Sequence, residues 1–282
     1  MVVPVASETG TYRLGVGDLL VEVSPRHGGR IASLRCGGVE ILATRLVHPT
    51  NWGSTFWTSP QSDWGWPPPA EFDDVAYAVQ LEPGAICLSG PATESLGVSL
   101  TKRISVEPAR GTLLFEYGVI NESRKPKTFS PWEVTRVLSN GLTFFPTGLC
   151  AGGSLDVRRI GRATWYEHEP DGLTDAGDKM FADGAGGFIA HIGGRILFAK
   201  SFVDLPPEEQ APGEGEVEIY ANNHYVEVEV QGPYTRIQPG AAARWRVRWH
   251  VCRLPPELTV SIGNLDLLAF ATSMVDEQRG FT

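Results

Sequence analysis

The segment Arg244–Val251, which reads RWRVRWHV, gives the clearest indication of the fold of this 282-residue chain. Trp245, Val247, Trp249 and Val251 alternate with three arginines and a histidine, so that every second side chain is apolar. Successive side chains of a β-strand point to opposite faces, and this period of two therefore predicts a strand with one buried and one solvated face. We expect the arginine face to be exposed.

Similar runs, separated by turn residues, occur along most of the chain. The pairs Gly28-Gly29, Gly37-Gly38 and Gly193-Gly194 each separate two such runs, as expected for tight connections between strands. The other predicted strands are Leu19–Val23, Arg30–Leu34, Val39–Leu42, Ala76–Leu81, Ala85–Ser89, Leu96–Val106, Thr112–Ile120, Lys127–Leu138, Phe188–His191, Arg195–Phe202 and Tyr225–Gln231. Closely spaced strands with turn residues between them predict an antiparallel β-sandwich.

One helical pattern lies near the C-terminus. Asn264 is suited to cap a helix from Leu265 to about Gln278, and Gly280 is suited to end it. The face expected to be buried consists of Leu268, Ala271, Thr272 and Val275. The Pro-rich stretch at 206–215 is expected to be a loop. Because no linker divides the chain, residues 1–282 are expected to form a single domain.

The composition narrows the classes of partner. A formal net charge of −9 without any basic run argues against nucleic acid and anionic membranes. No apolar run is long enough for a transmembrane helix, and the N-terminus does not resemble a signal peptide. The chain as given is therefore expected to be cytoplasmic, or periplasmic or secreted if a leader was removed. The sequence leaves the oligomeric state unknown.

Familiar cofactor and metal motifs are missing from the sequence. The four cysteines, Cys36, Cys87, Cys150 and Cys252, are far apart and form no CxxC pair. The sequence also lacks GxSxG, GxGxxG, HExxH and the phosphate-binding P-loop. We therefore expect neither a metal site nor a cofactor.

Half of the eight tryptophans fall in Asn51–Pro69, NWGSTFWTSPQSDWGWPPP, among amide, hydroxyl and carboxylate side chains. Wide aromatic faces beside hydrogen-bonding groups suit a flat ligand edged with hydroxyl groups, and a sugar is the commonest such ligand. The alternative is that these rings are core packing in a loop rich in Pro and Gly. The residues of this segment expected to contact a ligand are Trp57, Gln61, Asp63, Trp64 and Trp66.

The polar face of the predicted strand Tyr225–Gln231 carries two carboxylates, Glu227 and Glu229. Same-face neighbours lie roughly 6.5–7 Å apart along a strand, so the two would interact if both were shielded from water. A partly buried carboxyl group beside another carboxylate has a raised pKa, which suits proton transfer. The alternative is the exposed polar face of an amphipathic strand.

Two further segments hold candidate site residues. In Ser130–Val137, SPWEVTRV, Glu133 and Arg136 point to opposite faces of a regular strand, and only a bulge would bring them together. A surface pair is the alternative. Asp178 and Lys179 are expected in a loop, where ligand contacts are often found.

Three segments, in order along the chain, resemble galactose mutarotase-like (aldose 1-epimerase) proteins. Gly28–Leu42, GGRIASLRCGGVEIL, resembles the opening strands of that family. Val119–Val134, VINESRKPKTFSPWEV, is similar to its strand–turn–strand segment. Val228–Trp249, VEVQGPYTRIQPGAAARWRVRW, resembles the late strand in which a catalytic Glu precedes a polar residue, Gln and a Pro-Gly turn. The three matches together span most of the chain.

The resemblance implies a single all-β domain, an antiparallel β-supersandwich with a short C-terminal helix. Its concave polar face would bind a mono- or oligosaccharide. By position, Glu229 matches the family's catalytic glutamate, and Glu227 would lie beside it.

The chain departs from the family where a catalytic histidine is usual, because Trp132-Glu133-Val134 stands there. The early His-Gly pair of the family is missing as well. Glu133 is therefore the candidate for the acid. Arg136 lies near the histidine's expected position, but a guanidinium cannot serve as a general acid near neutral pH. We expect Arg136 to bind and orient, either by pairing with Glu133 or by contacting the ligand.

Two functions follow as hypotheses. In the first, a divergent sugar mutarotase, Glu229 takes the proton of the anomeric hydroxyl while Glu133 or another acid protonates the ring oxygen. In the second, the protein binds carbohydrate without catalysis, through its tryptophans, in glycan uptake or processing. A relative of the polysaccharide lyases is a third alternative, although the chain lacks the helical toroid that often accompanies their supersandwich.

Overall fold

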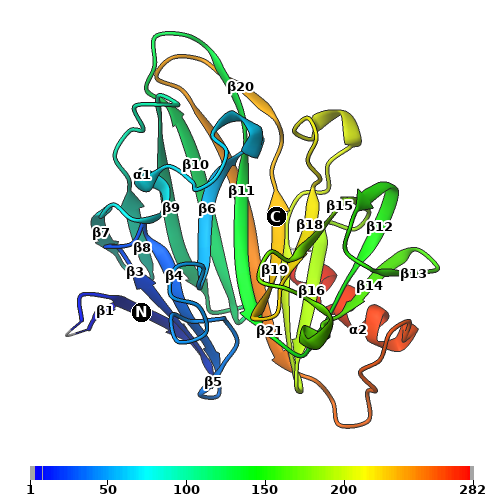
Figure 1. The fold of residues 1–282 in the computed structure, drawn as a ribbon. Coiled ribbons are helices and arrows are strands. Elements are labelled where there is room, and N and C mark those ends of the chain that lie inside the picture. The colour runs from blue at the N-terminus through cyan, green and yellow to red at the C-terminus, as the bar shows by residue number, and fades with distance from the viewer. Residues whose placement is uncertain (1–3, 8, 280–282) are drawn as a thin grey trace.

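The computed structural model describes residues 4–7 and 9–279, and antiparallel β-strands dominate it (Figure 1). In spatial order the first sheet contains β1 (Val5–Ala6), β2 (Tyr12–Val16), β3 (Leu19–Ser24), β4 (Arg30–Cys36), β6 (Ser54–Ser59), β11 (Lys127–Leu138), β19 (Tyr225–Gln231), β18 (Val217–Ala221), β15 (Asp178–Gly184) and β12 (Gly141–Gly153). Two short strands, β5 (Val39–Glu40) and β20 (Thr235–Ile237), pair with β4 and β11.

The second sheet shares β12 with the first. Its order is β7 (Ala78–Glu82), β8 (Ala85–Ser89), β9 (Val98–Glu107), β10 (Thr112–Asn121), β21 (Ala242–Arg253), β17 (Ile196–Ser201), β16 (Phe188–Gly193), β12, β14 (Ala163–Glu167) and β13 (Arg158–Ile160). The first part of β12 pairs with β14 and β16, and its last part pairs with β15. The two sheets are therefore continuous through one long strand.

The main hydrophobic core consists of the facing sides of the two sheets. The strand β21 contributes Trp245, Val247 and Trp249 to this core, as its alternation predicts. Arg246 and Arg248 lie on the other side and form ion pairs with glutamates, Arg248 with Glu107 at 2.9 Å. His250 was expected on the solvated face as well. It is buried instead, with its Nε2 2.7 Å from Ser201 Oγ, where the C-terminal helix comes near the strand.

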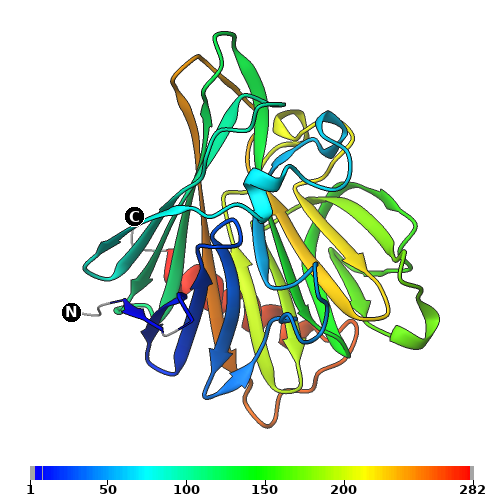
Figure 2. The same ribbon diagram turned by 60° about the vertical axis from the view of Figure 1, so that its left-hand side comes forward.

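The C-terminal helix α2 (Leu265–Arg279) covers the outer side of the second sheet (Figures 1 and 2). Asn264 caps it as predicted, because its side-chain oxygen accepts hydrogen bonds from the backbone N–H groups of residues 266 and 267 at 2.9 and 3.3 Å. The expected buried face needs a correction, since Leu267, Ala271 and Val275 are fully buried while Leu268 and Thr272 are partly exposed. Gly280, the expected stop, lies outside the described residues.

The remaining helices are short: α1 (Ala70–Asp73) and the 3₁₀ turns η1 (Gln61–Asp63), η2 (Pro170–Gly172) and η3 (Pro207–Glu209). None of the helices in the described part of the chain has the length and apolar character needed to span a bilayer.

Two segments expected to be loops are strands. Residues 54–59, within the tryptophan-rich segment, form β6, and Asp178 and Lys179 begin β15. β6 is buried along its whole length and so shows no alternation of polar and apolar residues. Gly53, with φ of +64°, precedes β6, and a Cβ there would lie 2.1 Å from the backbone oxygen of Ile31 in β4. Only glycine therefore lets β6 approach β4 at this point.

Candidate functional site

A cleft of about 540 Å³ lies on the outer side of the first sheet, over β6, β11, β19, β18 and β15. Its aromatic lining residues are Trp57, Trp66, Trp132, Tyr220 and Tyr225. Its charged lining residues are Asp175, Asp178, Lys179, Glu227 and Glu229. Asn51, Gln61 and Ser154 add polar groups. This combination of ring faces and hydrogen-bonding groups is typical of a ligand site.

The register of the strands explains which side chains meet in the cleft. Trp132 of β11 lies opposite Trp57 of β6, and Arg136 of β11 lies opposite Glu227 of β19. Glu227 in turn lies opposite Tyr220 of β18. Because directly paired residues project from the same face of a sheet, these side chains converge although they come from distant parts of the sequence.

A lysine from β15 lies between two glutamates. The Lys179 Nζ lies 2.6 Å from an oxygen of Glu218 and 3.1 Å from Glu229 Oε2. Burial alone would lower the pKa of Lys179, but the two carboxylates hold this pKa above its ordinary value. The lysine therefore stays charged at neutral pH and cannot act as a proton donor there.

Glu229 Oε1 has no hydrogen-bond partner among the described residues, although the side chain is fully buried. The other carboxylate of this group, Glu218, receives hydrogen bonds from Gln231 and from the backbone N–H of Gly215. Burial raises the pKa of Glu218 well above its ordinary value, and Lys179 offsets only part of this rise. A buried acceptor left open beside a cleft is a position that a ligand can fill.

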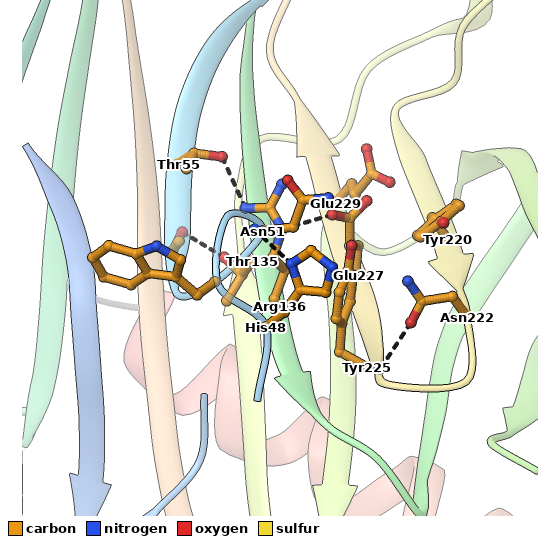
Figure 3. Close-up of polar contacts among 12 residues, drawn as sticks. His48, Asn51, Thr55, Thr135, Arg136, Tyr220, Asn222, Tyr225, Glu227 and Glu229 are labelled. Atoms are coloured by element: carbon orange, nitrogen blue, oxygen red, sulfur yellow. Dashed lines mark hydrogen bonds and ion pairs between the residues drawn. The ribbon is translucent and has the colours of Figure 1, made fainter. Parts of the chain in front are cut away.

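Arg136 holds the second carboxylate of the cleft (Figure 3). Its Nε lies 2.8 Å from Glu227, an Nη group donates to Thr55 Oγ1 at 3.3 Å, and its guanidinium lies over the Trp57 ring. Burial raises the pKa of Glu227 to about 7; Arg136 opposes this rise and the neighbouring Glu229 adds to it. A carboxyl group whose pKa is raised towards neutral pH is suited to proton transfer.

Most of the residues proposed from the sequence lie together. Trp57, Trp66, Gln61, Asp178, Lys179, Glu227 and Glu229 all line the cleft. Arg136 lies directly behind Glu227, with a side chain that is 1% exposed, and so orients this carboxylate rather than facing open solvent.

Glu133 lies elsewhere, and the expectation that it supplies the acid is wrong. The strand β11 pairs regularly with β6 and β19 around this residue, so no bulge turns Glu133 towards Arg136. Glu133 instead points into the core, where Lys200 and Trp249 contact Oε1 at 2.8 and 2.9 Å. The hydroxyl of Tyr117 donates to Oε2.

Two residues of the tryptophan-rich segment also lie outside the cleft lining. The Trp64 indole N–H donates to the backbone oxygen of Thr58 at 2.9 Å, and its partly exposed ring packs against Trp57 and Trp132. Asp63 is exposed at the end of η1. Trp64 therefore supports the aromatic wall without forming its surface.

The sequence reasoning missed several lining residues, above all Trp132, Tyr220 and Asp175. Trp132 precedes Arg136 by four positions on β11, so the strand alternation already places the two on one face. Tyr220 carries no comparable signal, because it reaches the cleft through the pairing of β18 with β15 and β19, and Asp175 lies in the turn that precedes β15. Among the described residues, no group of three or more His, Cys, Asp or Glu side chains is arranged to hold a metal ion.

Comparison with known proteins identifies the fold. No family model matches the sequence, and no curated protein matches it. A galactose mutarotase related enzyme from Lactobacillus acidophilus superimposes with a TM-score of 0.62 and 11% identity, over 89% of this chain and 100% of that one. A galactose mutarotase-like protein from Clostridium acetobutylicum gives 0.56 and 11%, over 90% and 99%.

A TPR-domain containing protein from Parabacteroides distasonis gives a TM-score of 0.64 and 14% identity, over 89% of this chain. The match covers 49% of that protein, so the chain spans about half of its length. The chain thus has the galactose mutarotase-like fold, and the predicted all-β supersandwich with a short C-terminal helix is confirmed. Identities this low establish the fold alone.

Proposed function

We propose that the cleft binds a sugar and interconverts its anomers, as a divergent aldose 1-epimerase-like mutarotase. One observation carries the proposal: Glu227 and Glu229 lie side by side on one face of β19, at the floor of a cleft walled by aromatic rings. The galactose mutarotase-like fold supports it, because proteins named for this activity are built in the same way. Glu229, the residue that resembles the family's catalytic glutamate, is one of the pair.

In this mechanism the two carboxyl groups have different roles. Glu229 takes the proton of the anomeric hydroxyl, and protonated Glu227 gives its proton to the ring oxygen. The bond between the anomeric carbon and the ring oxygen breaks, and an open-chain aldehyde forms. After the carbonyl group turns, the ring oxygen attacks its other face and both protons return. A pKa of about 7 makes the protonated form of Glu227 available at neutral pH.

The two cations of the site would hold these carboxylates in position. Lys179 contacts Glu229 Oε2, and Oε1 has no hydrogen-bond partner among the described residues, so that it would accept the proton of the sugar. Arg136 contacts one oxygen of Glu227 and is itself tied to Thr55. Both are positioning residues, because neither cation gives up its proton near neutral pH.

The test is the rate of anomer exchange, measured by NMR exchange spectroscopy or polarimetry on a panel of free aldoses. We expect the protein to accelerate exchange for at least one aldose, and Glu229→Gln and Glu227→Gln to lose that acceleration. Glu257→Gln is the matched control, since Glu257 is exposed and does not line the cleft. No acceleration by the unaltered protein, or equal rates in Glu229→Gln, would refute the proposal.

A second candidate is a carbohydrate-binding protein without catalysis. The ion pairs favour it, because Glu227 and Glu229 are each already held by a cation at 2.8 and 3.1 Å. Such pairs can serve to fix the shape of a binding surface for stacked sugar rings. Calorimetry that detects saccharide binding, together with NMR that detects no exchange of the bound sugar, would favour this candidate over the first.

A further inference from the structure

The charges that border the cleft are mostly negative. Asp175, Asp178 and Glu229 contribute three carboxylates, and Glu227, whose raised pKa lets it be protonated near neutral pH, contributes a fourth carboxyl group. Lys179 is the one cation among the described lining residues. A sugar entering the cleft therefore meets an excess of acceptors and of negative charge.

Neither cation near the cleft floor is available to an anionic ligand. Lys179 lies within 3.1 Å of Glu218 and Glu229, and its Nζ lies 4.8 Å from the centre of the Trp132 ring. The guanidinium of Arg136 is buried against Glu227. A phosphate or carboxylate on the ligand would have to displace one of these pairs and leave a buried carboxylate without its partner.

An independent observation points to the group that the cleft does fit. Glu229 Oε1 is buried at the cleft and accepts no hydrogen bond from any described residue. Two further acidic residues project from the same face of the sheet, since Glu218 is paired with Glu229 across the strands and Glu227 is two positions away on β19. An ammonium group, with three donors and a positive charge, satisfies such a cluster better than a neutral hydroxyl does.

The aromatic lining suits a cation as well. The ring of Trp132 already faces the Lys179 ammonium, and the rings of Tyr220, Tyr225 and Trp66 line other parts of the cleft. The faces of these rings are negative and attract a cation within about 6 Å. The walls and the floor therefore favour the same sign of charge on the ligand.

We propose that the cleft selects an amino sugar, in which a protonated amine meets the carboxylates of β19 and its neighbours, over neutral, phosphorylated or acidic sugars. This proposal rests on one part of the proposed function, that the cleft binds a sugar. It extends that function by naming the substrate class.

The experiment is isothermal titration calorimetry at pH 6.5, which keeps the amine protonated, with glucosamine, glucose, N-acetylglucosamine and glucose 6-phosphate. Galactosamine and galactose form a second matched pair. We expect the amino sugar of at least one pair to bind tenfold or more tightly than its neutral parent. Acetylation, which removes the charge but keeps the nitrogen, should abolish this advantage, and glucose 6-phosphate should bind most weakly.

Variants test which carboxylates carry the preference. Asp178→Asn should lower the ratio of amino-sugar to neutral-sugar affinity, whereas Asp171→Asn, at an exposed position outside the cleft lining, should not change that ratio. Equal affinity for charged and neutral sugars, or tighter binding of the phosphate, would overturn the inference.

The outcomes separate this inference from the proposed function. Anomer exchange of neutral sugars without an amine preference would refute the inference alone. Tight binding of an amino sugar without exchange would refute the catalytic proposal alone. Failure of every saccharide to bind would refute both.

Discussion

Two ion pairs between glutamate and lysine lie on opposite sides of the first sheet. Comparing them distinguishes an ion pair that stabilises the fold from one that belongs to the candidate site. Glu133 and Lys200 pair at 2.8 Å inside the core, and Glu229 and Lys179 pair at 3.1 Å beside the cleft. Both lysines lie near a tryptophan ring. Both sites thus combine a buried glutamate, a lysine and a tryptophan ring.

They differ in how completely their hydrogen bonds are satisfied. Both oxygens of Glu133 have donors, and Lys200 also donates to the backbone oxygen of Val228. In contrast, Glu229 keeps one oxygen open. Burial lowers the pKa of Lys200, which faces a single adjacent carboxylate, whereas two carboxylates raise the pKa of Lys179. A closed network stabilises a fold, and an open one at a cleft can receive a ligand.

The largest expected effect belongs to the core pair. Glu133→Gln leaves the buried Lys200 ammonium without its counter-charge, so the free energy of unfolding should fall by about 3–5 kcal/mol. Denaturation by urea, followed by tryptophan fluorescence, measures this change. A loss below about 1 kcal/mol would show that the core network is not a stabilising element.

The cleft pair should behave in the opposite way. Glu229→Gln removes one of three neighbouring carboxylates while Lys179 keeps Glu218, so the free energy of unfolding should change by less than about 1 kcal/mol. Anomer exchange should fall at least about a hundredfold, the ordinary contribution of a proton-transfer group. A large loss of stability with an unchanged rate would reverse the roles assigned to the two pairs.

The same contrast applies to two tryptophans of one segment. Trp66 is 59% exposed and lines the cleft, whereas Trp64 is partly buried against Trp57 and Trp132 and is not part of the cleft lining. Trp66→Ala should weaken saccharide binding by about 1–3 kcal/mol at nearly constant stability, as expected for an aromatic contact with the ligand. Trp64→Ala should mainly lower stability. Calorimetric titration and thermal unfolding of both variants compare the two effects, and equal losses of affinity would contradict the distinction.

The smallest expected effect is the pH dependence of the exchange rate and of stability. Since Glu227 acts in its protonated form, the exchange rate should fall as the pH rises above about 7, approaching tenfold per unit. The ordinary pKa of a glutamate, 4.5, applies to Glu227 in the unfolded chain, and its pKa in the folded protein is about 7. Between these two pH values, Glu227 should therefore bind more protons in the folded protein than in the unfolded chain. The stability that this carboxyl group contributes is therefore present below pH 4.5 and is lost as the pH rises through 7.

Rate profiles and denaturation curves from pH 4 to 9 test both statements. Glu227→Gln should remove the stability change between pH 4.5 and 7. A pH profile unaffected by that substitution would assign the titration to another of the groups that face Glu227, namely Arg136, Lys179, Tyr220, Tyr225 or Glu229.

Much of the fold could be predicted because an amphipathic strand is recognisable from the local alternation of polar and apolar residues. The bounds of β11 and β19 were predicted as they occur, and β21 was found with its buried face, apart from His250. Among the strands of the cleft, β6, β15 and β18 were missed, because their sequences show no clear alternation of exposed polar and buried apolar residues. The cleft glutamates were found because two carboxylates shared one face of a recognisable strand.

The sequence by itself determined which side chains share a face of each strand, because that property depends only on the period of two along the backbone. It placed Glu227 and Glu229 on the same face of one strand, and Glu133 and Arg136 on opposite faces of another. Only the tertiary structure decided which face borders the cleft and which borders the core, and which strand lies beside which. The pairing of β15, β18 and β19 sets Lys179 between Glu218 and Glu229, residues that no local pattern connects. Register between distant strands depends on the packing of the whole sheet, and a shift of one residue would turn each of these side chains to the other face.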